Sequence, residues 1–585
     1  MSKQNIFSKP KIIVGSGRND FDRSYIENYA SHLGTLDICC CLPCVAGTKG
    51  KINRSTFTRT ASVVSPAFPH VTEHFDFFKV PLKSLWSAWE DYKLNVNDLK
   101  SSFFSGYDYT ESNPLPSKVP LFSYSDLKNV LISNFGNSSA TTAQKTTAAA
   151  VANQCLSLLE EMHQAYPRSE TIATKFNLLP FAAYHKIYYE HYRNFSYETN
   201  QPALYNLDSL FDLVLGDSSF SLTSLNANTK LFMFRKHMVN YRMDYFHNIY
   251  PSLNYTTSVP NGIFKVPASV AGIPADANYG SPLDNRPFVL TSQGGSTMVS
   301  NFEETSMEHY ASLPVSVQSI RAAFALDKLQ RASAYAPKHI REQYMAQFGV
   351  DVPEDKSETS QRLGSFQSDV LFQEVTNMAA SETNALGELG AKGIGSGSQE
   401  RDIDFYCEHD SLIIGLHYFM VRSMYDAFDV SPWNVASVRE EFYQRAFENL
   451  GLRPMYAYEL NGYHDTYLNN ILGFKVPNAH YKASIDRNLG PFKDTFPEFG
   501  FNSQGYTYNG SVSSVLRSFT NHTLYTVGST PGVNMWYFKI SPYDLNHIFE
   551  TQFDGTYKPS QPQFFGQYRI KFATIAPMSV HGQPV

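Results

Sequence analysis

The chain has 585 residues, of which only 17% are charged and 14% are aromatic, mainly 43 Phe and 37 Tyr. An average soluble protein has about 25% charged residues, and the low charge together with the many aromatic residues excludes a disordered polyelectrolyte. The formal net charge is −6, with 48 Lys and Arg against 54 Asp and Glu. This composition suits either an aromatic-rich β core or a surface that other subunits cover, because interface cores are poor in charge and rich in aromatic residues.

The N-terminal segment holds the nearest approach to a basic cluster. Its cations are Lys3, Lys9, Lys11, Arg18 and Arg23. The neighbouring Asp20 and Asp22 partly offset them, so the sequence has none of the basic stripes or tails that nucleic-acid-binding domains carry. Contact with nucleic acid is therefore expected to be local, or to be left to a separate basic partner.

Neither a secretory signal nor a membrane span is visible in the sequence. The first residues (MSKQNIFSKPKII) contain no apolar stretch that ends in a small-residue cleavage site. The longest apolar runs, near residues 38–46 and 412–421, are well short of the ~20 residues needed to cross a bilayer. We therefore expect a soluble chain that is made in a cytoplasm and does not insert into membranes.

The cysteines are unevenly distributed along the chain. They are Cys39, Cys40, Cys41, Cys44, Cys155 and Cys407. Cys41 and Cys44 form a CxxC motif, which occurs in redox sites and in halves of zinc sites, but no second Cys or His pair follows at a suitable spacing. Free cysteine packs as a small apolar side chain, so we favour buried residues of a strand and keep metal binding or redox activity as the alternatives.

A strand and two helices are predicted next. Residues 70–77 (HVTEHFDF) alternate between polar and apolar side chains with the period of a half-buried strand. Apolar residues at i, i+3 and i+4 predict a helix over 148–162, which ends before Pro167. A second helix begins at Pro180, and its apolar stripe consists of Phe181, Tyr184, Ile187, Tyr188 and Tyr192. A stripe of this kind is more typical of a packed core than of a cofactor site.

Two segments in the middle of the chain have the composition of inserted loops. Thr256–Pro314 is poor in charge and rich in Gly, Pro, Ser, Asn and Thr, and a loop of this length is usually functional or disordered. Two helices are predicted after it, one after Ser316 as its capping residue and one from Pro337 to Gly349. Residues 387–397 (GELGAKGIGSG) predict a flexible Gly/Ser segment.

Two further strands are predicted towards the C-terminus. Residues 412–416 (LIIGL) form a continuous apolar run of strand length, which predicts a strand buried on both faces. Residues 567–572 (QYRIKF) alternate again with a period of two. Strands separated by long polar, aromatic-spotted stretches are typical of a sandwich or barrel with elaborate loops.

The sequence contains no recognisable catalytic motif. HExxH, GxSxG, the P-loop and the GxGxxG spacing are all missing. Glu408, His409 and Asp410 are three adjacent potential metal ligands, but neighbouring residues of a strand point to opposite faces. His185 and His191 are six residues apart on the predicted helix, a spacing that does not suit chelation on one face. The absence of motifs favours a structural protein without a cofactor and leaves a bound metal ion open.

Several motifs follow one another along the chain in a recognisable order. They are FDRS (21–24), the strand pair of 58–86, LPFAAY (179–184), RMDYF (242–246), IRAAF (320–324), EH (408–409) with IIGL (413–416), LGF (472–474) and IAPM (575–578). This series resembles the major capsid protein of the Microviridae, the small icosahedral single-stranded DNA phages. It is most similar to the gokushovirus-like and Bacteroidetes-associated branches.

The residues that match these motifs are taken as structural positions of the family. They are Phe21, Asp22, Arg23, Ser24, Leu179, Pro180, Phe181, Tyr184, Glu408, His409, Pro577 and Met578. The cysteine cluster at Cys39–Cys44 departs from the family pattern. Residues of about 103–175 and 491–534 look expanded or divergent, so no family detail is transferred to them.

The resemblance implies a mainly β fold: an eight-stranded antiparallel jelly roll with long, partly helical insertions between its strands. Residues 1–30 would form an N-terminal arm and residues 31–585 a single jelly-roll domain that includes these insertions. In gokushovirus-like relatives one insertion projects near the threefold axes and is thought to meet the host, and 256–314 occupies the matching position. Its candidate host-facing residues are Pro260, Asn261, Gly262, Gly294 and Gly295.

The function implied by the resemblance is structural. Copies of the chain would assemble through pentamers into a closed T=1 icosahedral shell around a circular single-stranded DNA genome, in the cytoplasm of a bacterial host. The other implied partners are a small basic DNA-binding protein, a DNA pilot (minor) protein and a host surface receptor, and the final location is the virion.

Two other interpretations remain open from the sequence. A soluble all-β carbohydrate-binding or carbohydrate-active protein would also be rich in aromatic residues, but 4 Trp in 585 residues is sparse for such a protein. A phage spike would normally carry repeats, and the sequence shows none.

Overall fold

The structure is a computed structural model. It describes residues 17–63, 67–94, 119–123, 157–163, 175–208, 235–251, 321, 325, 328–329, 340–351, 359–376, 389–398, 401–426, 430–448, 451–460, 471–493, 495–496, 499–501, 524–527, 530–533, 535–540, 545, 548–549 and 562–580. The chain divides into two compact units, one of residues 1–253 and 353–585 and one of Asn254–Val352.

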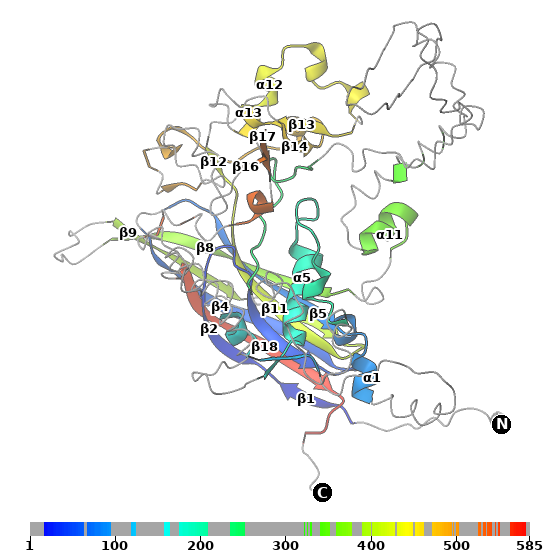
Figure 1. Cartoon of the computed structure of the whole chain (residues 1–585). Helices are drawn as coiled ribbons and strands as arrows, with labels where there is room; N and C mark the ends of the chain where they lie inside the picture. Colours follow the sequence, from blue (N-terminus) through cyan, green and yellow to red (C-terminus); the bar gives the residue numbers. More distant parts are fainter. Residues whose placement is uncertain are drawn as a thin grey trace, which may run out of the picture. The chain divides into compact units, whose positions relative to one another are not determined.

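One antiparallel sheet of ten strands forms the centre of the first unit within the described residues (Figure 1). Its hydrogen-bonded path has eight strands in the order β1-β18-β4-β9-β8-β5-β11-β3, while β2 pairs with β18 and β10 pairs with β4. The strands are β1 Asn19–Asp22, β2 Tyr25–Ser31, β3 Asp37–Cys44, β4 Lys49–Val63, β5 Val71–Pro81, β8 Gln361–Thr376, β9 Leu389–Ser398, β10 Ile403–Tyr406, β11 Ser411–Val421 and β18 Phe564–Ala576.

A short turn joins the two opposite edges of this sheet. β2 lies at one edge beside β18, β3 lies at the other edge beside β11, and only residues 32–36 connect them. Flat strands spaced about 4.8 Å apart would separate these edges by about 34 Å, whereas the connection reaches about 20 Å at most. The sheet must therefore curl, as Figure 1 shows. This confirms the predicted mainly β, antiparallel jelly-roll class.

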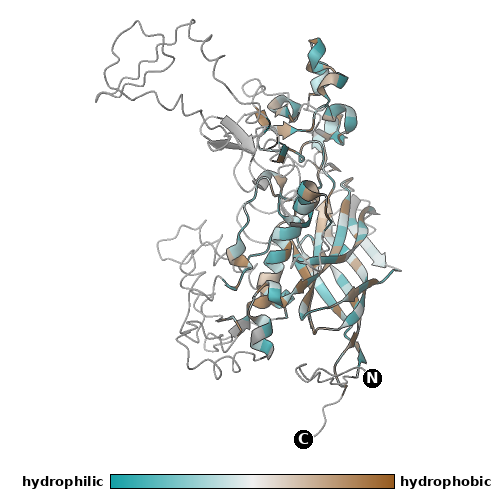
Figure 2. Ribbon diagram, turned by 90° about the vertical axis from the view of Figure 1, so that its right-hand side faces the viewer, coloured by the Kyte–Doolittle hydropathy of each residue, from teal (hydrophilic) through white to brown (hydrophobic). Residues whose placement is uncertain are grey.

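The two halves of the sheet differ in exposure. β18 and β4 alternate between buried and exposed residues, as the period of two in 567–572 predicted. Figure 2 shows hydrophilic and hydrophobic residues alternating along strands of the sheet. β11 is buried on both faces, as its continuous apolar run predicted. The prediction that 70–77 is only half-buried was wrong, because β5 is covered on both faces.

Helix α5 (Leu179–Ile187) lies against β5 and β11 and covers this half of the sheet (Figure 1). Pro180 lies in its first turn, where the missing N–H costs no hydrogen bond. The helix continues as one π-helical turn over Tyr188–Tyr192. Phe181, Tyr184 and Tyr188 all belong to the main apolar core, which confirms that the aromatic stripe is core.

The prediction of a flexible Gly/Ser segment at 387–397 was wrong for the residues that are described. β9 is an internal strand between β4 and β8. The glycines supply space: a Cβ on Gly397 would lie 2.2 Å from Nη1 of Arg54, and a Cβ on Gly393 would lie 2.4 Å from Cγ2 of Thr60. Glycine composition predicts a loop, but here the missing side chains admit large side chains of the neighbouring strand.

The remaining described elements are short. The α-helices other than α5 are α1 Trp89–Leu94, α11 Ile340–Phe348, α12 Pro432–Val435, α13 Ala457–Leu460 and α14 Ala479–Lys482. The 3-10 turns are Leu82–Ser84, Pro202–Leu204, Arg439–Glu441, Arg445–Phe447, Gly490–Lys493 and Met535–Phe538. The small sheets pair β6 Leu121–Ser123 with β7 Lys175–Asn177, β12 Tyr425–Asp426 with β15 Arg487–Asn488, β13 Arg453–Tyr456 with β14 Ile471–Lys475, and β16 Leu524–Val527 with β17 Thr530–Val533.

The helices predicted from periodicity are confirmed where they are described. Residues 157–161 are helical, and Leu158, Leu159 and Met162 are buried. In the second unit, α11 ends at Phe348, and Gly349 follows it with a positive φ of 69°. The rest of the 148–162 helix and most of the helix predicted after Ser316 lie outside the described residues.

The predicted N-terminal arm (1–30) is described only from residue 17. From Asn19 onward it is part of the sheet, because β1 and β2 both pair with β18. Within the part of the chain that the structure describes, no helix is long and apolar enough to cross a bilayer.

Candidate functional site

The FDRS motif forms a turn that lets two strands share one neighbour. The Asp22 carboxylate accepts hydrogen bonds from the backbone N–H of Ser24 (3.0 Å) and from its hydroxyl. The Ser24 hydroxyl in turn accepts from the backbone N–H of Phe572 (3.1 Å). Arg23 donates to the Pro43 carbonyl (2.9 Å). Phe21 lies in β1, so the motif directs the chain from β1 into β2 along β18.

The LPFAAY motif anchors α5 to the turn that joins the two sheet edges. Leu179, Pro180 and Phe181 are buried. The hydroxyl of the fully buried Tyr184 donates to the carbonyl of Leu36 (2.9 Å) and accepts from the backbone N–H of His237 (2.9 Å). The helix therefore holds this turn by a hydrogen bond as well as by packing.

Glu408, His409 and Asp410 lie in the bend between β10 and β11 rather than in a strand, and each has a different partner. Glu408 pairs with Lys79 at 2.5 Å, and His409 lies 3.3 Å from Glu90. Asp410 pairs with Lys93 and accepts from the backbone N–H of Ala46 (3.0 Å). Among the described residues there is no group of three His, Cys, Asp or Glu side chains placed to hold a metal ion.

The two helix histidines also have separate partners. Nδ1 of His185 lies 2.7 Å from Nε2 of His237, and Nε2 of His191 lies 2.9 Å from the hydroxyl of Ser360. Burial lowers the pKa of His237 well below its ordinary value. His185 and His191 thus contact different residues and do not face each other across a common site, in agreement with the sequence argument against chelation.

The cysteine cluster lies in β3, and Cys39, Cys40 and Cys44 are buried. Burial raises the pKa of Cys40 and of Cys41 to about 12, so both are neutral thiols near pH 7. Thiolates are the form that binds metals and attacks disulfides. Cys39, Cys40, Cys41 and Cys44 are therefore residues of a strand, as predicted. Cys407 is buried just after β10, and its hydrogen bond lowers the pKa of Cys44. Cys155 lies outside the described residues.

The remaining predicted positions lie at the end of β18 or outside the described residues. The carbonyl of Met578 accepts a hydrogen bond from the side-chain amide of Asn19 (2.6 Å). Pro577 precedes it, and Met578 is exposed. The candidate host-facing residues Pro260, Asn261, Gly262, Gly294 and Gly295, with all of 256–314, are not described.

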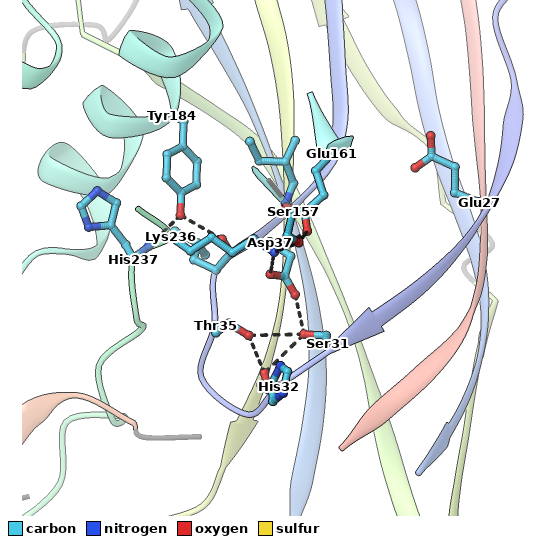
Figure 3. Close-up of polar contacts among 12 residues, drawn as sticks. Glu27, Ser31, His32, Thr35, Asp37, Ser157, Glu161, Tyr184, Lys236 and His237 are labelled. Carbon is cyan, nitrogen blue, oxygen red and sulfur yellow. Dashed lines mark hydrogen bonds and ion pairs between the residues drawn. The ribbon is translucent and has the colours of Figure 1, made fainter. Parts of the chain in front are cut away.

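A buried ionic cluster that the sequence analysis missed ties three segments together. We call Asp37, Ser157, Glu161 and Lys236 the edge cluster (Figure 3). Nζ of Lys236 lies 2.7 Å from Oδ1 of Asp37 and 2.8 Å from the Ser157 hydroxyl, and it also pairs with Glu161. Oε2 of Glu161 accepts from the backbone N–H of Ile38 (3.0 Å). The cluster joins the start of β3 to an inserted helix and to the 235–251 segment.

The edge cluster supports the turn that closes the sheet. Ser31, at the end of β2, donates its hydroxyl to Asp37, and the Thr35 hydroxyl donates to the carbonyl of His32 (2.7 Å). Figure 3 shows these hydrogen bonds running from the turn into the cluster. No local sequence signal indicates this arrangement, since Lys236 is 199 residues from Asp37 and 75 from Glu161.

Glu161 is expected to make the stability of this cluster depend on pH. Burial raises the pKa of Glu161 to about 7, above its ordinary value of 4.5, despite the opposing charge of Lys236. A raised carboxyl pKa contributes stability that is full below pH 4.5 and is lost as the pH rises through about 7. The melting temperature of Glu161→Gln, relative to the natural chain, should therefore rise between pH 4.5 and pH 7.

Scanning fluorimetry over a pH series measures this effect. The control is Glu160→Gln, on the same helix but exposed, whose difference from the natural chain should stay constant. Identical pH profiles for the natural chain and Glu161→Gln would contradict the assignment.

A second buried cluster lies inside the curled sheet. Glu73 of β5 is fully buried and accepts hydrogen bonds from Tyr29 (2.8 Å) and Thr58 (3.0 Å), with Nε2 of His417 at 2.9 Å. Burial opposes its ionisation, but the interactions with His417, Tyr29 and Arg54 together hold the pKa of Glu73 below its ordinary value. The Arg54 guanidinium lies 4.7 Å from the ring of Phe75. The edge cluster links a strand to two inserted segments, and the second cluster links four strands of the sheet, so both have the role of a scaffold.

Comparisons with known proteins agree with this geometry. A family model described as capsid protein (F protein) matches residues 137–501, which is more than half of the chain. The chain is also 21% identical, over 648 aligned residues, to capsid protein VP1 of Chlamydia phage 1, and the alignment covers 97% of this chain and 95% of that protein. The chain therefore belongs to the capsid protein (F protein) family of bacteriophages, which confirms its resemblance to the major capsid proteins of the Microviridae.

Proposed function

We propose that this chain is the subunit of a T=1 icosahedral shell that encloses a circular single-stranded DNA genome. The observation that carries the proposal is the capsid family match over 137–501 on a curled antiparallel sheet. Copies of the chain are the main partners, first in pentamers and then in the closed shell. The role is structural rather than enzymatic, and the family match favours it over the carbohydrate-binding alternative.

The surface of the described residues supports association with further copies. One segment between residues 433 and 447 exposes large apolar side chains to solvent, each 43–54% exposed. They are Trp433, Val435, Val438, Tyr443 and Phe447. Interface cores are enriched in aromatic residues, so burial against neighbouring subunits would remove this apolar surface from water and drive assembly.

The charge of the chain supports a division of labour in packaging. With a net charge of −6, the subunit cannot neutralise a genome by its overall charge, so a small basic DNA-binding protein supplies most of the counter-charge. A DNA pilot protein is the other internal partner. The assembled chain resides in the virion, and assembly takes place in the cytoplasm of the bacterial host.

Expression of the chain with the other structural proteins of its phage tests the assembly proposal. Electron microscopy should show closed shells, and light scattering after size exclusion should show these shells or pentameric precursors. A chain that remains monomeric under these conditions would refute the proposed function.

Host attachment is assigned to the 256–314 loop. Shortening this loop should leave particle assembly intact and reduce adsorption to host cells, measured as the fraction of particles that sediments with cells. Full-length particles are the reference for both measurements. If the shortened chain fails to assemble, the loop is an inter-subunit contact instead.

A further inference from the structure

Three neighbouring strands of the sheet carry charge of one sign only. β18, β4 and β9 are adjacent in the order β18-β4-β9, and their sequences contain no Asp or Glu. Their seven cations are Lys49, Lys51, Arg54, Arg59, Lys392, Arg569 and Lys571. In a chain with more acidic than basic residues, this concentration of positive charge is notable.

The strand register places most of these cations on the solvent-facing side. Along β4 the inward residues include the buried Arg54, and the alternate residues Lys49, Lys51 and Arg59 are exposed. Arg59 is opposite Ile394 of β9 and Phe565 of β18, both of which are exposed. Arg569 and Lys571 are exposed residues of β18, and Lys392 is partly exposed on β9. We call this side of β18, β4 and β9 the basic face.

The basic face also exposes aromatic rings beside its cations. Phe57 is 44% exposed and Phe565 is 37% exposed. The Arg59 guanidinium lies 5.1 Å from the ring centre of Phe57, and Nζ of Lys392 lies 5.9 Å from that of Phe565. Phe57 is opposite Gln567, two residues from Phe565, so the two rings are diagonal neighbours.

Acidic residues border the β1 and β10 side of the basic face. The exposed Asp20 and Asp22 of β1 are opposite Ile575 and Ala573 of β18, and the charge of Arg569 lowers the pKa of Asp22. Asp404 of β10 lies 3.8 Å from Lys51, and Asp369 of β8 lies 4.0 Å from His70. Within the described residues, Arg59, Lys392 and Lys571 form no ion pair. The positive charge that suits a negatively charged partner is therefore concentrated at the Arg59 and Lys392 end of the face, beside Phe57 and Phe565.

We propose that the basic face binds single-stranded nucleic acid, with its Lys and Arg side chains on the phosphates and with Phe57 and Phe565 as platforms for unpaired bases. Cations that follow a backbone, combined with exposed aromatic rings, are the features that recognise single strands. A duplex offers no free base faces for stacking, and an anionic membrane needs no paired aromatic platforms. The inference rests on the proposed function, in which the bound nucleic acid is the single-stranded genome. The basic face would then line the interior of the shell.

Binding of the purified chain to a fluorescein-labelled oligothymidylate tests the proposal by fluorescence anisotropy at several salt concentrations. The test variant is Arg59→Gln/Lys392→Gln/Arg569→Gln/Lys571→Gln. Each phosphate contact on a single strand contributes about 0.7 to the log–log salt slope, so this variant should lose about 3 from the slope. The control with the same change in net charge is Arg242→Gln/Lys328→Gln/Arg422→Gln/Lys482→Gln, at exposed positions elsewhere, and it should keep the slope of the natural chain.

The ring substitutions Phe57→Leu/Phe565→Leu test base stacking without a change in charge. They should weaken binding to the oligothymidylate about tenfold or more, with little effect on binding to a duplex of the same length. Equal losses in the two quadruple variants, or equal binding of single strand and duplex by the natural chain, would overturn the proposal. Binding to anionic phosphatidylglycerol vesicles in place of the oligonucleotide would also overturn it.

Particle analysis separates this inference from the proposed function. The Arg59→Gln/Lys392→Gln/Arg569→Gln/Lys571→Gln chain should still form shells, because the altered side chains face the genome, but the shells should contain less DNA. Normal shells from a natural chain that fails to bind the oligonucleotide would refute the basic face alone. Normal oligonucleotide binding without any shells would refute the proposed shell alone.

Discussion

Replacing Lys236 by methionine is expected to destabilise the fold by about 3–5 kcal/mol, the usual cost of breaking a buried ion pair by removing one partner. The Lys236 side chain is only 7% exposed, and its Nζ serves two carboxylates, those of Asp37 and Glu161. Without the ammonium group both carboxyl groups remain buried without a counter-charge, which costs free energy whether they stay ionised or take up a proton. The expected results are a melting temperature several degrees lower and a reduced yield of soluble protein.

Two further variants separate this electrostatic effect from the loss of a long side chain. Lys83→Met breaks the pair with Glu90, in which both side chains are about 40% exposed, and it should cost at most about 1 kcal/mol. The triple variant Lys236→Met/Asp37→Asn/Glu161→Gln removes all three charges and should recover much of the lost stability. A triple variant no more stable than Lys236→Met would show that packing, not charge, explains the loss.

Gly34→Ala is expected to have a comparable effect by a different mechanism. Gly34 lies in the 32–36 turn with a φ of 72°, where a side chain costs about 1–2 kcal/mol. An added Cβ would also lie 2.6 Å from the Ile540 carbonyl oxygen, and overpacking of this kind costs about 1–3 kcal/mol. The Gly34 N–H donates to the Phe419 carbonyl (3.0 Å), so the clash cannot be relieved without disturbing the turn.

Gly451→Ala is the matched control for this substitution. Gly451 has a similar φ of 74°, but no atom lies within 4 Å of an added Cβ. Its melting temperature should therefore report the cost of the backbone conformation alone, and Gly34→Ala should melt clearly lower. Equal melting temperatures for the two variants would mean that the contact with Ile540 relaxes freely.

Local sequence patterns correctly predicted those strands and helices in which the burial of each residue follows from its position in the element. The alternation in 567–572 and the apolar run at 412–416 correspond to β18 and β11. Pro180 and the aromatic stripe after it correspond to α5. In each case the burial of a residue follows from its own position in a strand or helix, so the period of apolar residues is sufficient.

Patterns failed where a neighbouring segment changes the environment of a strand. The polar residues of 70–77 suggested a solvent-facing side, yet Glu73 and Asp76 are buried and have partners on other segments, namely His417 on β11 for Glu73 and Tyr192, after α5, for Asp76. The glycines of β9 suggested a loop because glycine-rich composition is typical of loops. In the structure these glycines instead make room for Arg54 and Thr60 of the neighbouring strand. Neither environment can be inferred from the segment itself.

The sequence by itself determined the family, the antiparallel β class and the low charge of this protein, because ordered motifs, local periodicity and composition are properties of the chain alone. It also showed no basic stripe, and no run of consecutive residues in the chain forms one. Only the tertiary structure placed β18, β4 and β9 side by side and brought Lys236 between Asp37 and Glu161. The physical reason is that charge acts through space: cations spread over several hundred residues form one face only after the strands have paired.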